Sequence, residues 1–247
     1  MYEQSLAAVL ATSDPFSQTM VKQAEMSVVP ALRLYVGFRA DCYGSGMFAR
    51  SLLPAVFAIC LSAQAWAGDL VVRVTTSDGR PVADAVVMLP AVAGSPKPVA
   101  PARLEIAQKN KQFTPFVLVV PVGAVVAFPN LDKFRHHVYS FSKGNKFELE
   151  LFGREEKRVV TFGTVGIAAI GCNIHDQMVA FIRVVDTPWA EKTAADGTAT
   201  LKSIPGGKVR LSVWHPYAKA KDQTVVQDVT PDASGAVTII LDLTPPT

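Results

Sequence analysis

The eight residues GCNIHDQM, at positions 171–178, decide how this chain is interpreted. They place three potential metal donors at regular intervals, namely Cys172, His175 and Met178. Apolar runs on either side predict two strands joined by a short loop. Such a loop can bring a thiolate, an imidazole and a thioether to one point, although the same residue types also occur as ordinary core side chains. A metal site therefore needs a further donor from elsewhere in the chain.

The further donor that this set lacks is a second histidine. Soft sulfur ligands with imidazole favour copper, and two histidines with one cysteine and a weak axial methionine form the blue-copper electron-transfer arrangement. Besides His175, the sequence contains His136, His137 and His215. His136 and His137 stand at the head of a predicted strand in FPNLDKFRHHVYSFS, residues 128–142. His215 is interpreted as a structural residue of another domain.

Further motifs lie around these residues: FTP at 113–115, VAFPNLD at 126–132, VTF at 160–162, Gly166 and CNIH at 172–175. Their order, over roughly residues 104–185, resembles that of the cupredoxin family, with a loop of the amicyanin and plastocyanin type. In that family the first histidine ligand closes the pattern N-x-D-x-x-x-H, which falls here on Asn130, Asp132 and His136. The resemblance implies that one type 1 copper ion is held by His136, Cys172, His175 and Met178.

Two residues depart from the family pattern. His137 replaces the asparagine that usually follows the first ligand, so either the surroundings of the copper are altered or His137 itself ligates. Asp176 stands where relatives often have proline, which should loosen the loop and add a negative charge near the metal. Changes around the ligands tune affinity and potential rather than metal identity.

The rest of the chain after residue 68 also predicts strands. Short apolar runs at regular spacing favour a β-sandwich or barrel, and no helix is expected there. The stretches DGRPVADAVVML at 78–89, ADGTATL at 195–201 and IPGGKVRLSVW at 204–214 resemble the start and end of a carboxypeptidase-regulatory-like, transthyretin-like sandwich.

The expected fold class is therefore all-β. We expect a cupredoxin Greek-key β-sandwich at residues 93–186, inserted into a second, small Ig- or transthyretin-like β-sandwich that is split between residues 68–92 and 187–247. The connector between residues 90 and 101, rich in proline, alanine and serine, is the best candidate for a boundary.

The N-terminal region predicts export. Residues 47–67 combine Arg50, an apolar run and the Ala65-Trp66-Ala67 cleavage pattern of a secretory signal peptide. We expect cleavage before Gly68, a periplasmic mature protein without a membrane span, and residues 1–46 to be a misassigned N-terminal extension. A lipoprotein anchor at Cys60 is the alternative, although Cys60 lacks a small residue directly before it.

The composition limits the function. With 49% hydrophobic and 18% charged residues the chain is expected to be ordered, and its formal net charge of +3 is too mild to imply nucleic acid. Of three cysteines, Cys42 and Cys60 precede the predicted cleavage point, which leaves Cys172 as the single thiol and excludes a disulfide framework.

We expect a non-enzyme that carries single electrons between redox partners such as a cytochrome or a dehydrogenase. A link to amine oxidation, as in methylamine utilization, rests on analogy with amicyanin alone. The alternatives are a periplasmic copper carrier or sequestering protein without electron transfer, and a surface binding module with a vestigial copper loop. Lys133, Arg135, Lys143 and Lys146 could attract an acidic partner or form an ordinary solvated edge.

Overall fold

The computed structural model describes residues 66–101, 104–231 and 235–244. Residues 1–65, with the predicted extension and most of the predicted signal peptide, lie outside the described residues, so export stays a prediction. Within the described ranges the chain forms β-strands and one short 3-10 turn, Lys221–Gln223. The prediction of an all-β protein is confirmed. No helix in these ranges has the length and apolar character that a membrane span requires.

The strands largely follow the apolar runs of the sequence, and β9 and β14 coincide with the strands expected at residues 159–162 and 209–214. Three strands were not predicted. β4 and β12 are three residues long and largely polar, and β15 is an edge strand whose central residues are exposed, so none shows a clear alternating pattern. In chain order the strands are β1 (Trp66–Thr75), β2 (Val86–Met88), β3 (Ala107–Lys109), β4 (Gln112–Thr114), β5 (Val117–Pro121), β6 (Ala124–Ala127), β7 (His136–Ser140), β8 (Phe147–Phe152), β9 (Val159–Phe162), β10 (Gly166–Gly171), β11 (Val179–Val185), β12 (Ala190–Lys192), β13 (Thr198–Pro205), β14 (Val209–Trp214), β15 (Thr224–Val229) and β16 (Ala236–Ile240).

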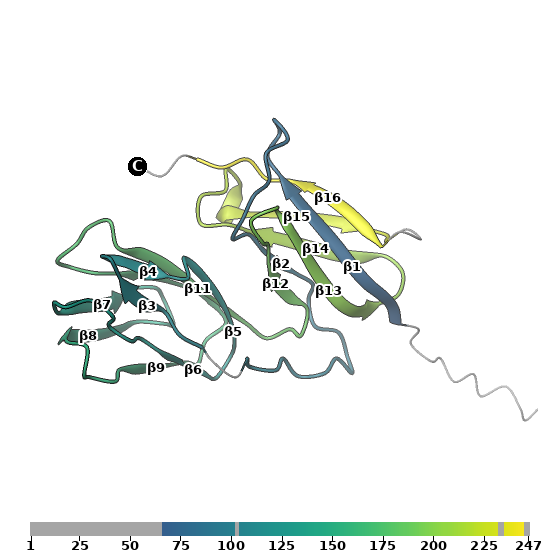
Figure 1. Ribbon diagram of the computed structural model, residues 1–247. Coiled ribbons are helices and arrows are strands. Elements are labelled where there is room, and N and C mark those ends of the chain that lie inside the picture. The colour runs from purple at the N-terminus through teal and green to yellow at the C-terminus, as the bar shows by residue number, and fades with distance from the viewer. Residues whose placement is uncertain (1–65, 102–103, 232–234, 245–247) are drawn as a thin grey trace, which may run out of the picture. The chain divides into compact units, whose positions relative to one another are not determined.

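A five-stranded sheet carries the residues of the predicted metal site. Its strand order is β5-β11-β10-β7-β8, in which β5 runs parallel to β11 and the other pairs are antiparallel. A second layer contains the antiparallel pair β6-β9. Glu105 forms a parallel bridge to Ala127 at the end of β6, and Gln108 forms one to Asn130. Of these strands, all but β10 are labelled in Figure 1.

The core between these layers follows from strand alternation. In β11, Ala180, Ile182 and Val184 are fully buried while their neighbours are more exposed. They pack in one cluster with residues of the second layer, including Val126 and Phe162. Complete burial of an aliphatic side chain such as Ile182 contributes about 1.5–3 kcal/mol. The sandwich therefore gives a rigid support for the loops at its ends.

The first and last strands of the described chain pair with each other. β1 lies between β13 and β16, and Figure 1 shows this blue strand beside a green and a yellow one. β2 lies between β12 and β14. Buried Thr193 ties them further, since its Oγ1 accepts from the N–H of Ala85 at 2.9 Å and donates to the carbonyl of Val82 at 2.8 Å. A split sandwich requires this pairing, although its family type and boundaries stay predictions.

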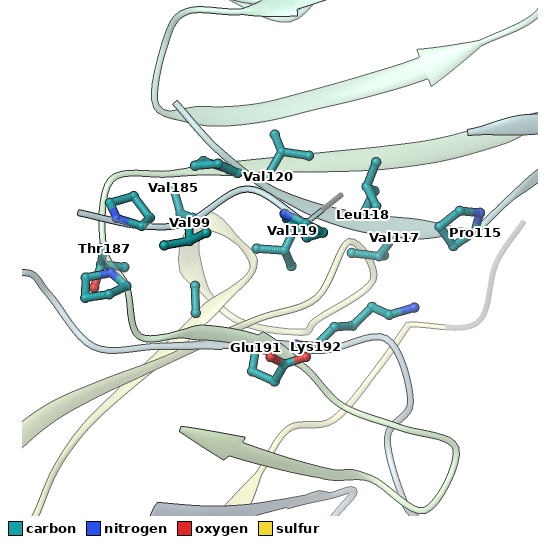
Figure 2. A pocket seen from close by; sticks show the side chains of 15 residues that line it. Val99, Pro115, Val117, Leu118, Val119, Val120, Val185, Thr187, Glu191 and Lys192 are labelled. Carbon is teal, nitrogen blue, oxygen red and sulfur yellow. Dashed lines mark hydrogen bonds between the residues drawn. The ribbon is translucent and has the colours of Figure 1, made fainter. Parts of the chain in front are cut away.

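A hollow of about 380 Å³ lies beside the proline-rich connector. Figure 2 shows its lining, which combines valine side chains of β5 with Glu191 and Lys192 of β12. The lining contains no histidine and no cysteine. The hollow is thus separate from the predicted metal ligands.

His215 directly follows β14 and is 5% exposed. Its Nδ1 accepts a hydrogen bond from the N–H of Tyr217 at 3.1 Å, so the neutral ring carries its proton on Nε2. Burial lowers the pKa of His215 from 6.5 to about 4, and the Asp84 carboxylate opposes this only in part. The interpretation of His215 as a structural residue agrees with this position.

We expect His215 to make folding stability depend on pH. Its folded pKa is lower than its unfolded pKa, so the stability it contributes is complete above about pH 6.5 and is lost as the pH falls toward about 4. His215→Asn keeps a hydrogen-bond acceptor but cannot titrate, and should remove this component, which is at most about 3 kcal/mol. Urea unfolding of both proteins across this pH range measures the difference. A difference that stays constant with pH would contradict the assignment.

Candidate metal centre

The loop at residues 172–178 connects two paired strands and is closed at its neck. β10 ends at Gly171, which pairs with Val179 at the start of β11. Within the loop, the N–H of Met178 donates to the carbonyl of His175 at 2.9 Å. The predicted strand-loop-strand arrangement is present, so the strand pairing fixes where the loop's side chains can lie.

Three of the four predicted ligands converge. One potential ligand atom from each of His136, Cys172 and His175 lies within 4.8 Å of the others. The Nδ1 of His136 is 3.9 Å from the Sγ of Cys172, which is 3% exposed. Met178 is 1% exposed and belongs to the same apolar cluster as Cys172. The loop thus contributes three of the residues and β7 contributes the fourth.

His136 is the first residue of β7 and is fully buried. Its Nε2 lies 2.8 Å from the Oδ2 of Asp132. A carboxylate accepts at this position, so Nε2 carries the proton and Nδ1 is left with a free lone pair. That lone pair is on the nitrogen nearest to Cys172. The carboxylate therefore fixes the ring form that can bind a metal.

Asp132 is held by backbone groups of another turn. Its carboxylate accepts from the N–H groups of Asn110 and Lys111 at 2.7 and 3.1 Å. These residues form the tight turn between β3 and β4, where both have positive φ. Burial opposes the ionisation of Asp132, but the hydrogen bonds from His136 and from the turn outweigh it and lower the pKa of this carboxyl. Asp132 therefore stays charged beside His136.

Asn130 organises the segment between β6 and β7. Its Nδ2 donates to the carbonyls of Phe134 and Phe152 at 2.8 and 3.0 Å, and its Oδ1 accepts from the N–H of Asp132 at 2.9 Å. Asn130 is 1% exposed, so these bonds are shielded from water. The pattern N-x-D-x-x-x-H thus corresponds in this chain to a connected set of hydrogen bonds that positions His136.

His175 supplies the second imidazole. The ring is half-buried, and its Nδ1 is buried without a hydrogen-bond partner. A buried polar atom without a partner is costly in a folded protein unless a further group completes it. With the free Nδ1 of His136 and the thiol of Cys172, this nitrogen makes up a soft donor set that fits copper.

The two departures from the family pattern lie away from the convergence point. His137 follows His136 on the strand and therefore faces the opposite side, where its Nε2 lies 2.9 Å from the Oε1 of Glu148. His137 is not part of the three-residue cluster. Asp176 is exposed in the loop. The structure therefore favours His136 over His137 as the ligand.

Phe134 is a residue of the site that the sequence interpretation missed. Its ring lies 5.0 Å from that of His136 and 5.7 Å from that of His175, and it is 42% exposed. A single phenylalanine in a polar segment carries no periodic signal, so this role could not be read from the sequence. Nearby, Arg135 forms an ion pair with Glu156 at 2.9 Å, which offsets part of the expected positive charge.

No family model matches this sequence, and a comparison with curated proteins found no match. Several solved structures of copper proteins are similar to it. A copper-containing nitrite reductase from Thermus scotoductus SA-01 is 28% identical, and the match covers 40% of this chain and 25% of that one, with a TM-score of 0.33. This chain thus spans a quarter of the reductase's length.

Two smaller proteins are matched almost over their whole length. A purple cupredoxin from Nitrosopumilus maritimus is 20% identical, with 33% of this chain and 99% of that one covered and a TM-score of 0.30. A mutant of amicyanin in its reduced Cu(I) form is also 20% identical, with 40% and 98% covered and a TM-score of 0.32. The cupredoxin-like match therefore covers up to 40% of this chain, and at these TM-scores it assigns no function by itself.

Proposed function

We propose that this protein is an exported type 1 copper protein that carries single electrons between redox partners in the periplasm. The observation that carries the proposal is the convergence of His136, Cys172 and His175, with one potential ligand atom each within 4.8 Å. Met178, buried in the same cluster as Cys172, would be the weak fourth ligand. A copper ion in this set would supply a one-electron couple between Cu(I) and Cu(II).

The chain's own residues prepare the site for this role. Asp132 keeps the proton of His136 on Nε2, and the paired strands β10 and β11 hold the loop that carries the other three side chains. Cys172 is shielded from water, while His175 is half-buried and lies nearer the surface. A support of this rigidity limits the rearrangement that a change of oxidation state would otherwise require.

The surface beside His175 supports a role in exchange with a protein partner. Phe134 and Ile174 are 42% and 47% exposed, Ile174 directly precedes His175, and Phe134 contacts both histidines of the cluster. Exposed apolar side chains in one region are typical of interaction sites. The proposed partners are a cytochrome or a dehydrogenase, and an amine-oxidising chain is the analogy that amicyanin offers. The remaining strands are proposed to form a carboxypeptidase-regulatory-like sandwich without enzymatic activity.

Copper loading should give an intense blue colour from thiolate-to-Cu(II) charge transfer. Cys172→Ser and His136→Asn should abolish the visible band, because each removes a strong ligand. His137→Asn is the matched control and should keep the band, because His137 faces Glu148 instead. Visible spectra of the copper-loaded variants measure this. A colourless Cu(II) complex of the parent protein would defeat the proposal, and a blue protein that no one-electron donor can reduce would favour the copper carrier.

Asp132→Asn should weaken copper binding and raise the reduction potential. The variant keeps an oxygen acceptor but loses the negative charge that supports His136 and favours Cu(II). Mutation of such a supporting group lowers metal affinity roughly 10–100-fold. Chelator competition and redox titration measure the two effects. The control is Glu148→Gln, which changes the equivalent carboxylate on His137. Equal effects of the two substitutions would show that Asp132 has no special role.

A further inference from the structure

Another hollow, of about 580 Å³, lies between three segments that follow β1, β14 and β16. Its lining comes from residues 76–82, 217–219 and 242–244. Small-molecule sites in proteins have volumes of roughly 300–1,000 Å³, so the hollow is large enough for such a ligand. None of the proposed metal ligands lines it. The hollow is therefore a candidate binding site that is independent of the metal centre.

Hydrogen bonds tie the three segments to one another. The N–H of Ser77 donates to the Oδ1 of Asp242 at 2.8 Å, and the N–H of Lys219 donates to the carbonyl of Asp242 at 2.8 Å. The N–H of Thr244 donates to the carbonyl of Tyr217 at 2.7 Å. Asp242 thus joins all three segments. Because the walls of the hollow are already fixed in this way, binding costs little conformational entropy.

The formal charges in the lining cancel, since it contains two carboxylates and two cations, Asp78, Asp242, Arg80 and Lys219. The Nε of Arg80 donates to the Oδ2 of Asp78 at 2.8 Å. The hydrogen bond from Thr76 and the neighbouring Arg80 lower the pKa of Asp78, and a backbone N–H lowers the pKa of Asp242. Both carboxylates are thus ionised at neutral pH. A charged ligand of either sign would meet like charges here, so the lining favours a neutral ligand.

The lining also combines hydrogen-bond donors, hydrogen-bond acceptors and apolar surface. Carboxylates accept, ammonium and guanidinium groups donate, and hydroxyl groups such as that of Thr76 do both. Lys219 is exposed, so its ammonium group is accessible to a ligand. Pro81 and Leu243 add apolar surface to the same hollow. A sugar ring has matching chemistry, because its hydroxyl groups donate and accept around the edge, its faces carry C–H groups, and it has no net charge.

We propose that this hollow binds a neutral saccharide. The carboxylates of Asp78 and Asp242 accept hydrogen bonds from its hydroxyl groups, and such charge-assisted bonds are stronger than neutral ones. Arg80 and Lys219 donate to its oxygen atoms, and a face of the sugar ring packs against Leu243. A neutral peptide is the competing ligand, but no lining residue belongs to a strand whose edge could pair with a peptide backbone. The inference does not depend on the proposed electron-carrier function.

Isothermal titration calorimetry and amide NMR spectra of the full chain can test this site. The probes are maltotriose, cellotriose and N,N′-diacetylchitobiose, which are neutral and differ in linkage. We expect at least one of them to bind and to shift the N–H signals of Ser77 and Lys219, which lie in the walls of the hollow. N-acetyl-trialanine amide and calcium chloride serve as comparison ligands, and neither should bind as tightly.

Asp242→Asn keeps an acceptor for the N–H of Ser77 but loses the charge, and should weaken saccharide binding roughly tenfold. Lys219→Ala should have a similar effect. Lys221→Ala is the matched control, because Lys221 is exposed two positions further along and does not line the hollow. It should leave the affinity unchanged.

The proposal is overturned if none of the three saccharides binds, or if binding in the parent chain shifts only signals outside the hollow. Equal affinity of the parent, Asp242→Asn and Lys219→Ala proteins would also overturn it. Tighter binding of the peptide would identify a peptide site instead, and binding of calcium alone would identify a cation site. Because the signal shifts are measured in the parent chain, the test holds even if a variant fails to fold.

Discussion

The pairing of Tyr139 with Gly171 is the contact on which the arrangement of the site depends. It is the register contact that joins β7 to β10, and it brings His136 to Cys172 although they are 36 residues apart in the sequence. Because side chains alternate along a strand, a shift of one residue in this register would turn His136 outward and His137 inward. The pairing of β7 with β10 therefore determines whether the ligands from the two segments can meet. The buried Val138 and Ile170 secure it from the core side.

Buried polar side chains also determine how the site is arranged. Asn130 fixes the segment before β7, and Asp132 links the turn between β3 and β4 to the ring of His136. A buried carboxylate is costly unless its hydrogen bonds are satisfied, and here two backbone N–H groups and one imidazole satisfy it. The negative charge of Asp132 therefore lies directly beside His136, the proposed metal ligand. The same hydrogen bonds that hold these segments in the fold thus also position His136 for metal binding.

Much of this site could be predicted because its residues are close in sequence or part of a spaced pattern. GCNIHDQM gave three donors from one loop, and N-x-D-x-x-x-H pointed to His136 rather than His137. The bonds of Asp132 to Asn110 and Lys111 could not be predicted, since they join residues more than twenty positions apart through tertiary contact. The role of Phe134 was missed because a single phenylalanine in a polar segment carries no periodic signal. Likewise, β15 escaped prediction because an exposed edge strand lacks the apolar alternation that the core imposes.

Gly171 has no side chain, so the ring of Tyr139 can lie on the backbone next to Cys172. The proposed function depends on which metal binds and which side chains bind it. X-ray absorption spectroscopy of the copper-loaded chain tests it most directly. We expect one close sulfur and two nitrogen scatterers around copper, with the sulfur lost in Cys172→Ser. A copper shell of oxygen and nitrogen alone would contradict a type 1 site.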